Sequence, residues 1–238
     1  MKKNILIGAI TLLAGSLIAA DASPKEDVLA AAKKLAAQSN YSWKATTDNG
    51  ANAQFTPGPT EGKTDKGGLI MISMSFNDNT TDGFMKGTNV AVKTDEGWKT
   101  AVEATSGDGG FNMGSMMARR MQTTKAPAAE VEDLVAKAKD LKKDGDVISG
   151  ELTEDGAKAL IAMGGRRGGG QAPAATEAKG SVKFWIKDGT LTKYESKVSG
   201  KRDFNGEVRE IERTVTVEIK DVGTTKITVP EEAQKKLS

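Results

Sequence analysis

The chain has 238 residues, with 34 basic side chains against 32 acidic ones and a formal net charge of +2. It contains no cysteine and no histidine, which excludes disulfides, Ser-His-Asp or Cys-His nucleophile activation, and histidine metal sites. The nearly balanced charge gives no electrostatic reason to expect nucleic acid or an anionic membrane as a partner.

The first 22 residues have the pattern of a secretory signal peptide. Met1 to Asn4 is short and basic, Ile5 to Ala20 is apolar and uncharged, and Ala20 and Ala22 place small residues at a cleavage site. A run of about 16 apolar residues is short for a membrane span, which needs roughly 20. We therefore expect a periplasmic or secreted protein, cleaved near Ala22 and without stable membrane insertion. An uncleaved anchor helix is the alternative.

The first half of the expected mature chain begins with a helix and continues in strands. Ser23 and Glu26 form a capping-box pattern, which predicts an amphipathic helix ending near Ser39. Residues 48–66 are rich in turn formers and are predicted to be a loose hairpin or an exposed loop. Alternating or continuous apolar residues predict strands, the last two paired as a hairpin, at 41–47, 68–76, 84–93 and 98–105.

The middle of the chain returns to helical patterns. Ala126-Pro127 is expected to begin a helix whose apolar stripe continues to Leu141, with Gly145 closing it. Residues 146–152 are predicted to be a strand, and Thr153 caps a short helix after it. Residues 164–178 have a low-complexity, glycine-rich composition that is typical of a flexible insertion.

Residues 181–230 are predicted to form four antiparallel strands. Val182, Phe184 and Ile186 share one face of the first of these strands. In the long third strand an apolar face includes Val215, Val217 and Ile219. Arg213 interrupts that face, and we expect it near a sheet edge or paired with a carboxylate, because an unpaired buried guanidinium is costly.

These elements predict an α+β fold in one domain, residues 23–238, with one curved antiparallel sheet of about seven to nine strands. Two main helices are expected on its concave face. The element order, the pattern FWIKDG-x-L-x-K-Y-E-x-x-V-x-G and the ending KDVGTTKITVPEEA resemble the LolA-like superfamily. That group includes periplasmic lipoprotein carriers, RseB-like sensor domains and mycobacterial lipid-carrying lipoproteins. The resemblance implies a half-open β-barrel whose helices cover a concave side that binds acyl chains.

The resemblance further implies a non-enzymatic carrier or sensor of an apolar ligand, such as a lipid or a lipoprotein acyl chain. The alternative is a structural or interaction module of the cell envelope, with a packed core and an envelope protein as its partner. We expect no catalytic residue, cofactor or metal. The apolar side chains expected to line the ligand site are Leu69, Ile70, Ile72, Val182, Phe184, Ile186, Val215, Val217 and Ile219.

A methionine cluster, Met113, Met116, Met117 and Met121, permits three interpretations. In the first interpretation, the cluster is a flexible apolar lid over a lipid cavity, because thioethers adapt to irregular apolar partners. In the second, the thioethers bind Cu(I), a soft metal ion. In the third, the cluster belongs to a short helix that packs its methionines on the sheet and leaves Arg119 and Arg120 in solvent.

Overall fold

The computed structural model describes residues 23–51, 53, 56–76, 79–106, 112–164, 174–204 and 206–238. The predicted signal peptide, residues 1–22, lies outside the described residues. So do residues 165–173, which make up most of the predicted glycine-rich insertion.

Eleven antiparallel strands form a single sheet in the described part of the chain, in the order β6-β5-β4-β3-β2-β1-β11-β10-β9-β8-β7. The strands are β1 Asn40–Asp48, β2 Thr60–Asp65, β3 Leu69–Phe76, β4 Asn79–Lys86, β5 Asn89–Thr94, β6 Gly97–Thr100, β7 Ala138–Asp144, β8 Val147–Leu152, β9 Thr176–Lys187, β10 Thr190–Phe204 and β11 Glu207–Lys220. The helices are α1 Pro24–Ala36, α2 Ala101–Thr105, α3 Met113–Thr123, α4 Pro127–Lys137, α5 Glu154–Gly164 and α6 Glu231–Lys236.

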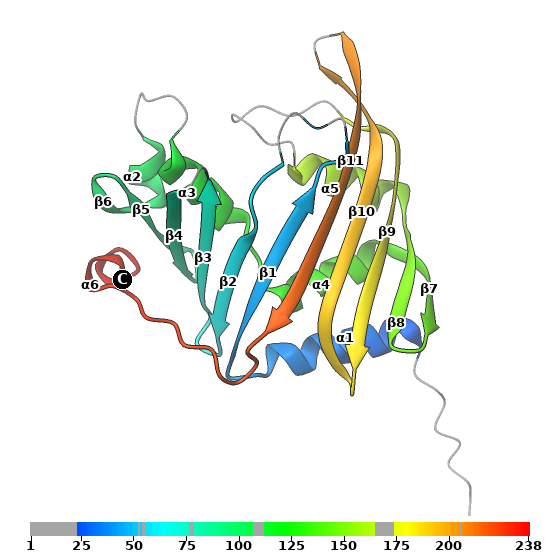
Figure 1. The fold of residues 1–238 in the computed structure, drawn as a ribbon, viewed down its shortest axis with the longest axis horizontal. Coiled ribbons are helices and arrows are strands. Elements are labelled where there is room, and N and C mark those ends of the chain that lie inside the picture. The colour runs from blue at the N-terminus through cyan, green and yellow to red at the C-terminus, as the bar shows by residue number, and fades with distance from the viewer. Residues whose placement is uncertain are drawn as a thin grey trace, which may run out of the picture.

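Two groups of helices cover one face of the sheet, which we call the inner face. Helices α1, α4 and α5 lie over the β8–β10 end, whereas α2 and α3 lie over the β4–β6 end (Figure 1). Helix α6 packs on the β5–β6 end from the other side, the outer face. The α+β class and the antiparallel sheet with helices on one face are confirmed. The sheet is open and has eleven strands, more than the predicted seven to nine.

Two additional strands come from stretches that were predicted to be longer or looser. Residues 84–93 are not one strand, because Gly87 adopts a φ of 62° and turns the chain between β4 and β5. The predicted loop 48–66 ends in β2, which pairs with both β1 and β3. The strand predicted at 98–105 stops at Thr100, because Thr100 and Glu103 form a capping box that starts α2.

The helix predicted from Ala126 to Leu141 is wrong in its second half. Helix α4 ends at Lys137, and Ala138–Asp144 is the edge strand β7, paired with β8. Ala138 and Leu141 still pack against the core, so their apolar side chains are compatible with a helix and with a strand. Residues 138–144 form a strand because they pair with β8, which the local sequence does not reveal.

The C-terminal sheet region contains three strands, not four. Strand β9 begins at Thr176, inside the stretch predicted to be a flexible insertion, and β11 ends at Lys220. The following segment carries Ile227 and Val229 to the outer face, where they pack with Phe84, Ala91 and Ala233. It closes off apolar side chains that would otherwise face water at the β3–β6 end.

The main core lies between the inner face and the helices, and it joins both ends of the sheet. Val28 and Leu35 of α1, Val131 of α4 and Phe184 of β9 are each fully buried in it. Trp43 of β1 lies flat over Gly62 of β2: a Cβ at Gly62 would be 2.1 Å from the indole Cε2. Glycine on the neighbouring strand therefore makes room for the indole in the middle of the sheet.

Candidate apolar ligand site

Eight of the nine predicted lining residues lie on the inner face. Five are buried in the main core: Ile70, Ile72, Val182, Phe184 and Val217. Three are partly buried and pack against it: Ile186, Val215 and Ile219. The structure therefore brings residues from β3, β9 and β11 to one apolar face.

Leu69 lies apart from this group, on the outer face. It packs with Phe84 and Ala91 in the second cluster, beneath α6. Neighbouring side chains of a strand point to opposite faces, so Leu69 and Ile70 cannot line one site.

Helix coverage of the inner face is uneven. The closest contacts of α1 and α5 fall on β9 and β10, and those of α2 and α3 fall on β4, β5 and β6. Between them lie β11, β1, β2 and β3, in the middle of the sheet (Figure 1). Besides Ile219, four apolar side chains on the inner face of these strands are only partly buried, and we call these four the central strip: Ala45, Met74, Ile211 and Val215.

Strand register places three members of the central strip close together. Thr60 of β2 pairs with both Ala45 and Met74, and Thr47, two residues after Ala45 on β1, pairs with Val215. Ala45 and Met74 therefore lie on either side of Thr60, and Val215 lies opposite Thr47, so that apolar side chains and threonines alternate across these strands. Such a surface can hold an aliphatic chain without any polar group having to recognise it.

The methionines of α3 divide into two pairs. Met117 and Met121 are buried in the main core, next to Gly83, where an added Cβ would lie 2.9 Å from Met121 Cγ and 3.0 Å from Met117 Cγ. Met113 and Met116 are partly buried. The first pair packs on the sheet, as the third interpretation expects, and leaves the second pair as the adaptable apolar surface of the helix.

Polar groups also reach the inner face. The Tyr194 hydroxyl, fully buried, donates to Glu130 Oε2 at 2.5 Å. Burial and the negative charge of Glu130 raise the pKa of Tyr194 well above its ordinary value. Burial likewise raises the pKa of Tyr41 to about 12, although the Ala128 backbone N–H acts in the opposite direction. Both phenols are therefore held in the neutral form that donates a hydrogen bond.

Arg213 was predicted near a sheet edge or paired with a carboxylate. It lies one residue beyond Thr214, the last residue of β11 that pairs with β1, so only β10 pairs with the strand at this point. Its Nη2 donates to the Leu160 carbonyl of α5 and not to a carboxylate. Arg202 of β10 is only 3% exposed, and its Nη2 donates to the Ile161 carbonyl at 3.1 Å. Two guanidinium groups thus bind consecutive carbonyls in the last turns of α5, where positive charge is favoured.

The sequence-based prediction did not include three polar residues of the inner face, Arg202, Tyr194 and Glu130. For the first two, alternation along 190–204 was the available signal, because Tyr194, Val198 and Arg202 share one face of that strand. For Glu130 the sequence carries no such signal, since its contact with Tyr194 joins positions 64 residues apart.

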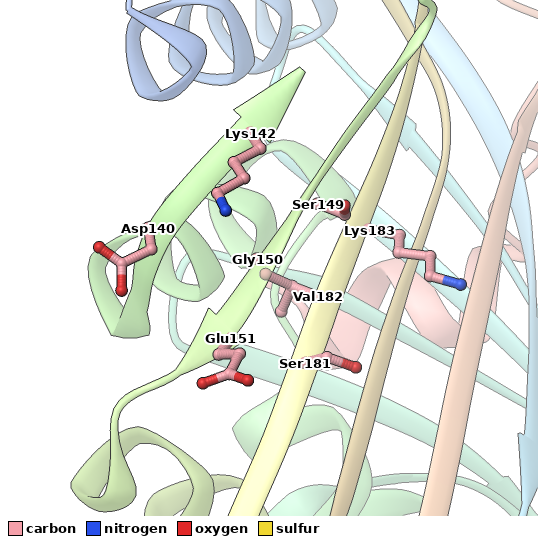
Figure 2. Close-up of a pocket in the computed structure, with 8 residues that line it drawn as sticks. All are labelled: Asp140, Lys142, Ser149, Gly150, Glu151, Ser181, Val182 and Lys183. Carbon is pink, nitrogen blue, oxygen red and sulfur yellow. The ribbon is translucent and has the colours of Figure 1, made fainter. Parts of the chain in front are cut away.

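A surface depression of about 470 Å³ lies at the β7 edge, lined by residues of β7, β8 and β9. It forms at a β-bulge, where Asp140 has a φ of 52° and Gly150 lets the β7 backbone approach closely. Its charged side chains, Asp140, Lys142, Glu151 and Lys183, spread apart and do not converge on one point (Figure 2). The depression does not have the lining that an apolar ligand requires.

Neither a metal site nor a membrane span is found in the described residues. No group of three or more acidic side chains there is arranged to hold a metal ion. None of the helices in that part of the chain combines the length and apolarity needed to cross a bilayer.

No family model and no curated protein matches the sequence. Solved structures with a similar outline include the lipoprotein LppX of Mycobacterium tuberculosis, 11% identical, with a TM-score of 0.48 over 89% of this chain and 100% of that one. LprF of Mycobacterium bovis is 12% identical, with a TM-score of 0.44 over 88% and 97%. A LolA superfamily protein of Nitrosomonas europaea is 8% identical, with a TM-score of 0.34 over 87% and 96%.

These similarities concern overall outline, and they assign no ligand and no site residue to this chain.

Proposed function

We propose that this protein is an exported, non-enzymatic carrier or sensor of an apolar ligand, a lipid or the acyl chain of a lipoprotein. The observation that carries the proposal is the central strip. Its apolar side chains lie on the inner face, between the two groups of helices, and remain partly accessible. Apolar surface that folding leaves accessible inside a concave face is available to a ligand.

The predicted lining residues enter this proposal in two ways. Val215 belongs to the central strip, while Phe184, Val182 and Val217 form the packed wall beneath it. Met113 and Met116 are the side chains of α3 that would cover a bound chain as a lid, because they remain only partly buried. Met117 and Met121 would anchor that helix to the sheet.

A packed envelope module is the second candidate, and one observation favours it. Ile72, Val182, Phe184 and Val217 are at most 2% exposed, so helices already fill the space over these positions. In that case the partner would be an envelope protein that binds the accessible surface, and the chain would hold no lipid.

Ligand extraction and dye binding distinguish the two candidates. The protein purified without detergent is expected to carry lipid that mass spectrometry detects, and the delipidated protein should bind the uncharged dye N-phenyl-1-naphthylamine. Ala45→Glu places a carboxylate in the central strip, and we expect it to weaken dye binding at least about tenfold, because burying an unpaired charge is costly.

Thr46→Glu is the matched control, since Thr46 is exposed and points to the outer face from the same strand. It should leave dye binding within about twofold of the original. Absence of both lipid and dye binding in the unmodified protein would contradict the carrier function and favour the packed module. For the proposed export, N-terminal sequencing of the mature protein should find a start close to Ser23.

A further inference from the structure

Two threonine hydroxyls lie among the apolar side chains of the central strip. Thr60 of β2 pairs with Ala45 on one side and with Met74 on the other, so all three side chains share the inner face. Thr47 of β1 pairs with Val215, which packs against the main core. Both threonines are partly buried. The apolar surface proposed to bind the ligand therefore also contains two polar groups.

Other threonines of the inner face bond to the protein itself. Thr64 of β2 and Thr94 of β5 each donate from Oγ1 to a backbone carbonyl oxygen across the next turn, at 3.0 Å and 2.9 Å. Such bonds satisfy hydroxyls that water does not reach freely. Thr47 and Thr60 make no hydrogen bond to any residue that the structure describes. Their hydroxyls depend on solvent or on a ligand.

A ligand that lies on the central strip removes water from both hydroxyls. Covering a hydroxyl with hydrocarbon alone leaves it unsatisfied, and the free energy that this costs opposes binding. Because a hydroxyl donates one hydrogen bond, an oxygen acceptor on the ligand removes this cost. The ligand that fits the strip therefore carries an oxygen acceptor next to its hydrocarbon chain.

The positions of the two threonines suit one compact acceptor group. Thr47 lies two residues beyond Ala45, the partner of Thr60, so the two threonines are diagonal neighbours on β1 and β2. Diagonal neighbours in an antiparallel pair lie roughly 7–8 Å apart, which leaves room for one group that accepts from both hydroxyls. An acyl group presents its oxygens at the end of a hydrocarbon chain, and Ala45, Met74 and Val215 are placed to contact that chain.

We propose that Thr47 and Thr60 hold the acyl carbonyl group of the ligand, in an ester or in a free carboxyl group. This inference rests on the proposed carrier function and adds the polar contact that fixes where the chain begins. Each hydroxyl donates a hydrogen bond to an acyl oxygen, while the hydrocarbon chain lies on the apolar side chains of the strip.

Two single-chain probes with the same acyl chain, methyl dodecanoate and dodecanoate, distinguish an ester from a free acid. Each is titrated by displacement of N-phenyl-1-naphthylamine from the delipidated protein. The dye has no carbonyl group, so its own affinity reports on the apolar surface alone. The test variant is Thr60→Val, because valine keeps the branched shape that suits a strand and removes only the hydroxyl.

Thr60→Val should weaken binding of at least one probe about three- to tenfold, the range for one hydrogen bond between uncharged groups. The affinity for the dye should stay within about twofold. Thr47→Val should act in the same way. Thr46→Val is the matched control, since Thr46 is exposed on the outer face of the same strand, and it should change none of these affinities. The probe that loses more affinity identifies the ester or the free acid as the group that is held.

The outcomes separate this inference from the carrier function. If the dye binds but Thr47→Val and Thr60→Val leave both probes unchanged, the carbonyl site is wrong while the carrier function stands. The same conclusion follows if Thr60→Val weakens the dye as much as the probes, because the hydroxyl would then affect only the shape of the strip. If neither the dye nor a probe binds the unmodified protein, the carrier function itself is contradicted.

Discussion

Phe184 and Trp185 are neighbours on β9 with opposite surroundings. Phe184 is fully buried under the helices, whereas Trp185 lies on the outer face, with the Lys193 Nζ 4.4 Å from its ring centroid. A side chain in a packed core loses both its transfer free energy and its contacts when it is truncated. A side chain on the surface of an open cavity loses much less.

Phe184→Ala is therefore expected to lower the free energy of unfolding by about 3–5 kcal/mol, measured by urea titration. Trp185→Ala, the matched control, should cost about 1 kcal/mol, the scale of an exposed cation–π contact. A loss below about 2 kcal/mol for Phe184→Ala would show that the space above Phe184 is not filled, and that the ligand site extends beyond the central strip.

At the scale of elements, α6 is held in place by a pair of hydrogen bonds. Lys236 Nζ lies 2.9 Å from both oxygens of Glu103, in α2. The hydrogen bond from Lys236, followed by those from the Thr100 backbone and hydroxyl, lowers the pKa of Glu103 to about 2. The contact connects α6 to α2 at the same end of the sheet, where both helices pack against β5 and β6.

A lowered pKa in the folded state means that Glu103 stabilises the fold above its unfolded pKa, near 4.5. This contribution is lost as the pH falls toward about 2. Lys236→Ala should lower the urea midpoint at about pH 7, and the difference from the unmodified protein should shrink between about pH 4.5 and pH 2. Lys235→Ala, which removes only the contact with Glu231 inside α6, is the control. A difference that stays constant with pH would contradict the role of Glu103.

Some helices and strands could be predicted from short sequence patterns, such as a capping box or the alternation of apolar and polar residues. The Ser23–Glu26 capping box starts α1 as predicted. Alternation identified β1, β11 and the part of β9 that begins at Ser181, and a continuous apolar run identified β3. Elements set by distant partners could not be predicted in the same way. The change from α4 to β7 at Ala138 has no glycine or proline to mark it, and it depends on pairing with β8.

For the candidate site, too, the sequence predicted the local features but not those that depend on distant segments. Alternation placed Val182, Phe184, Val215 and Val217 on one face correctly, because side-chain direction in a strand is a local property. It could not show that helices bury Phe184 and leave Val215 partly accessible. Helix placement depends on the whole sheet, and so do the hydrogen bonds that Arg202 and Arg213 donate to neighbouring carbonyls of α5.

For the whole molecule, one core connects both ends of the sheet. Val92 of β5 and Met117 of α3 belong to the same buried cluster as Phe184 and Ile161. Since neither end has a separate inner core, we expect residues 23–238 to unfold as a single cooperative domain.

The three tryptophans give a direct test, because Trp98, Trp43 and Trp185 lie on β6, β1 and β9, spread across the sheet. Three variants, each keeping one tryptophan and replacing the other two with phenylalanine, report on the two ends and the middle. For each variant, fluorescence and far-ultraviolet circular dichroism should give the same urea midpoint. An earlier fluorescence transition at Trp98 alone would show that the β4–β6 end unfolds as an independent unit.

The pairing of β1 with β11 joins the first and last strands of the sheet at its centre, with partners such as Ser42 and Lys220. A chain that enters a compartment N-terminus first must therefore keep one edge of β1 unpaired until nearly all of its length has arrived. The two halves of the chain can form local hairpins during that time, but the β1–β11 pairing that joins them is still absent. Closure of the sheet is thus expected to be a late event in folding, because it requires contacts between segments that are far apart in the sequence.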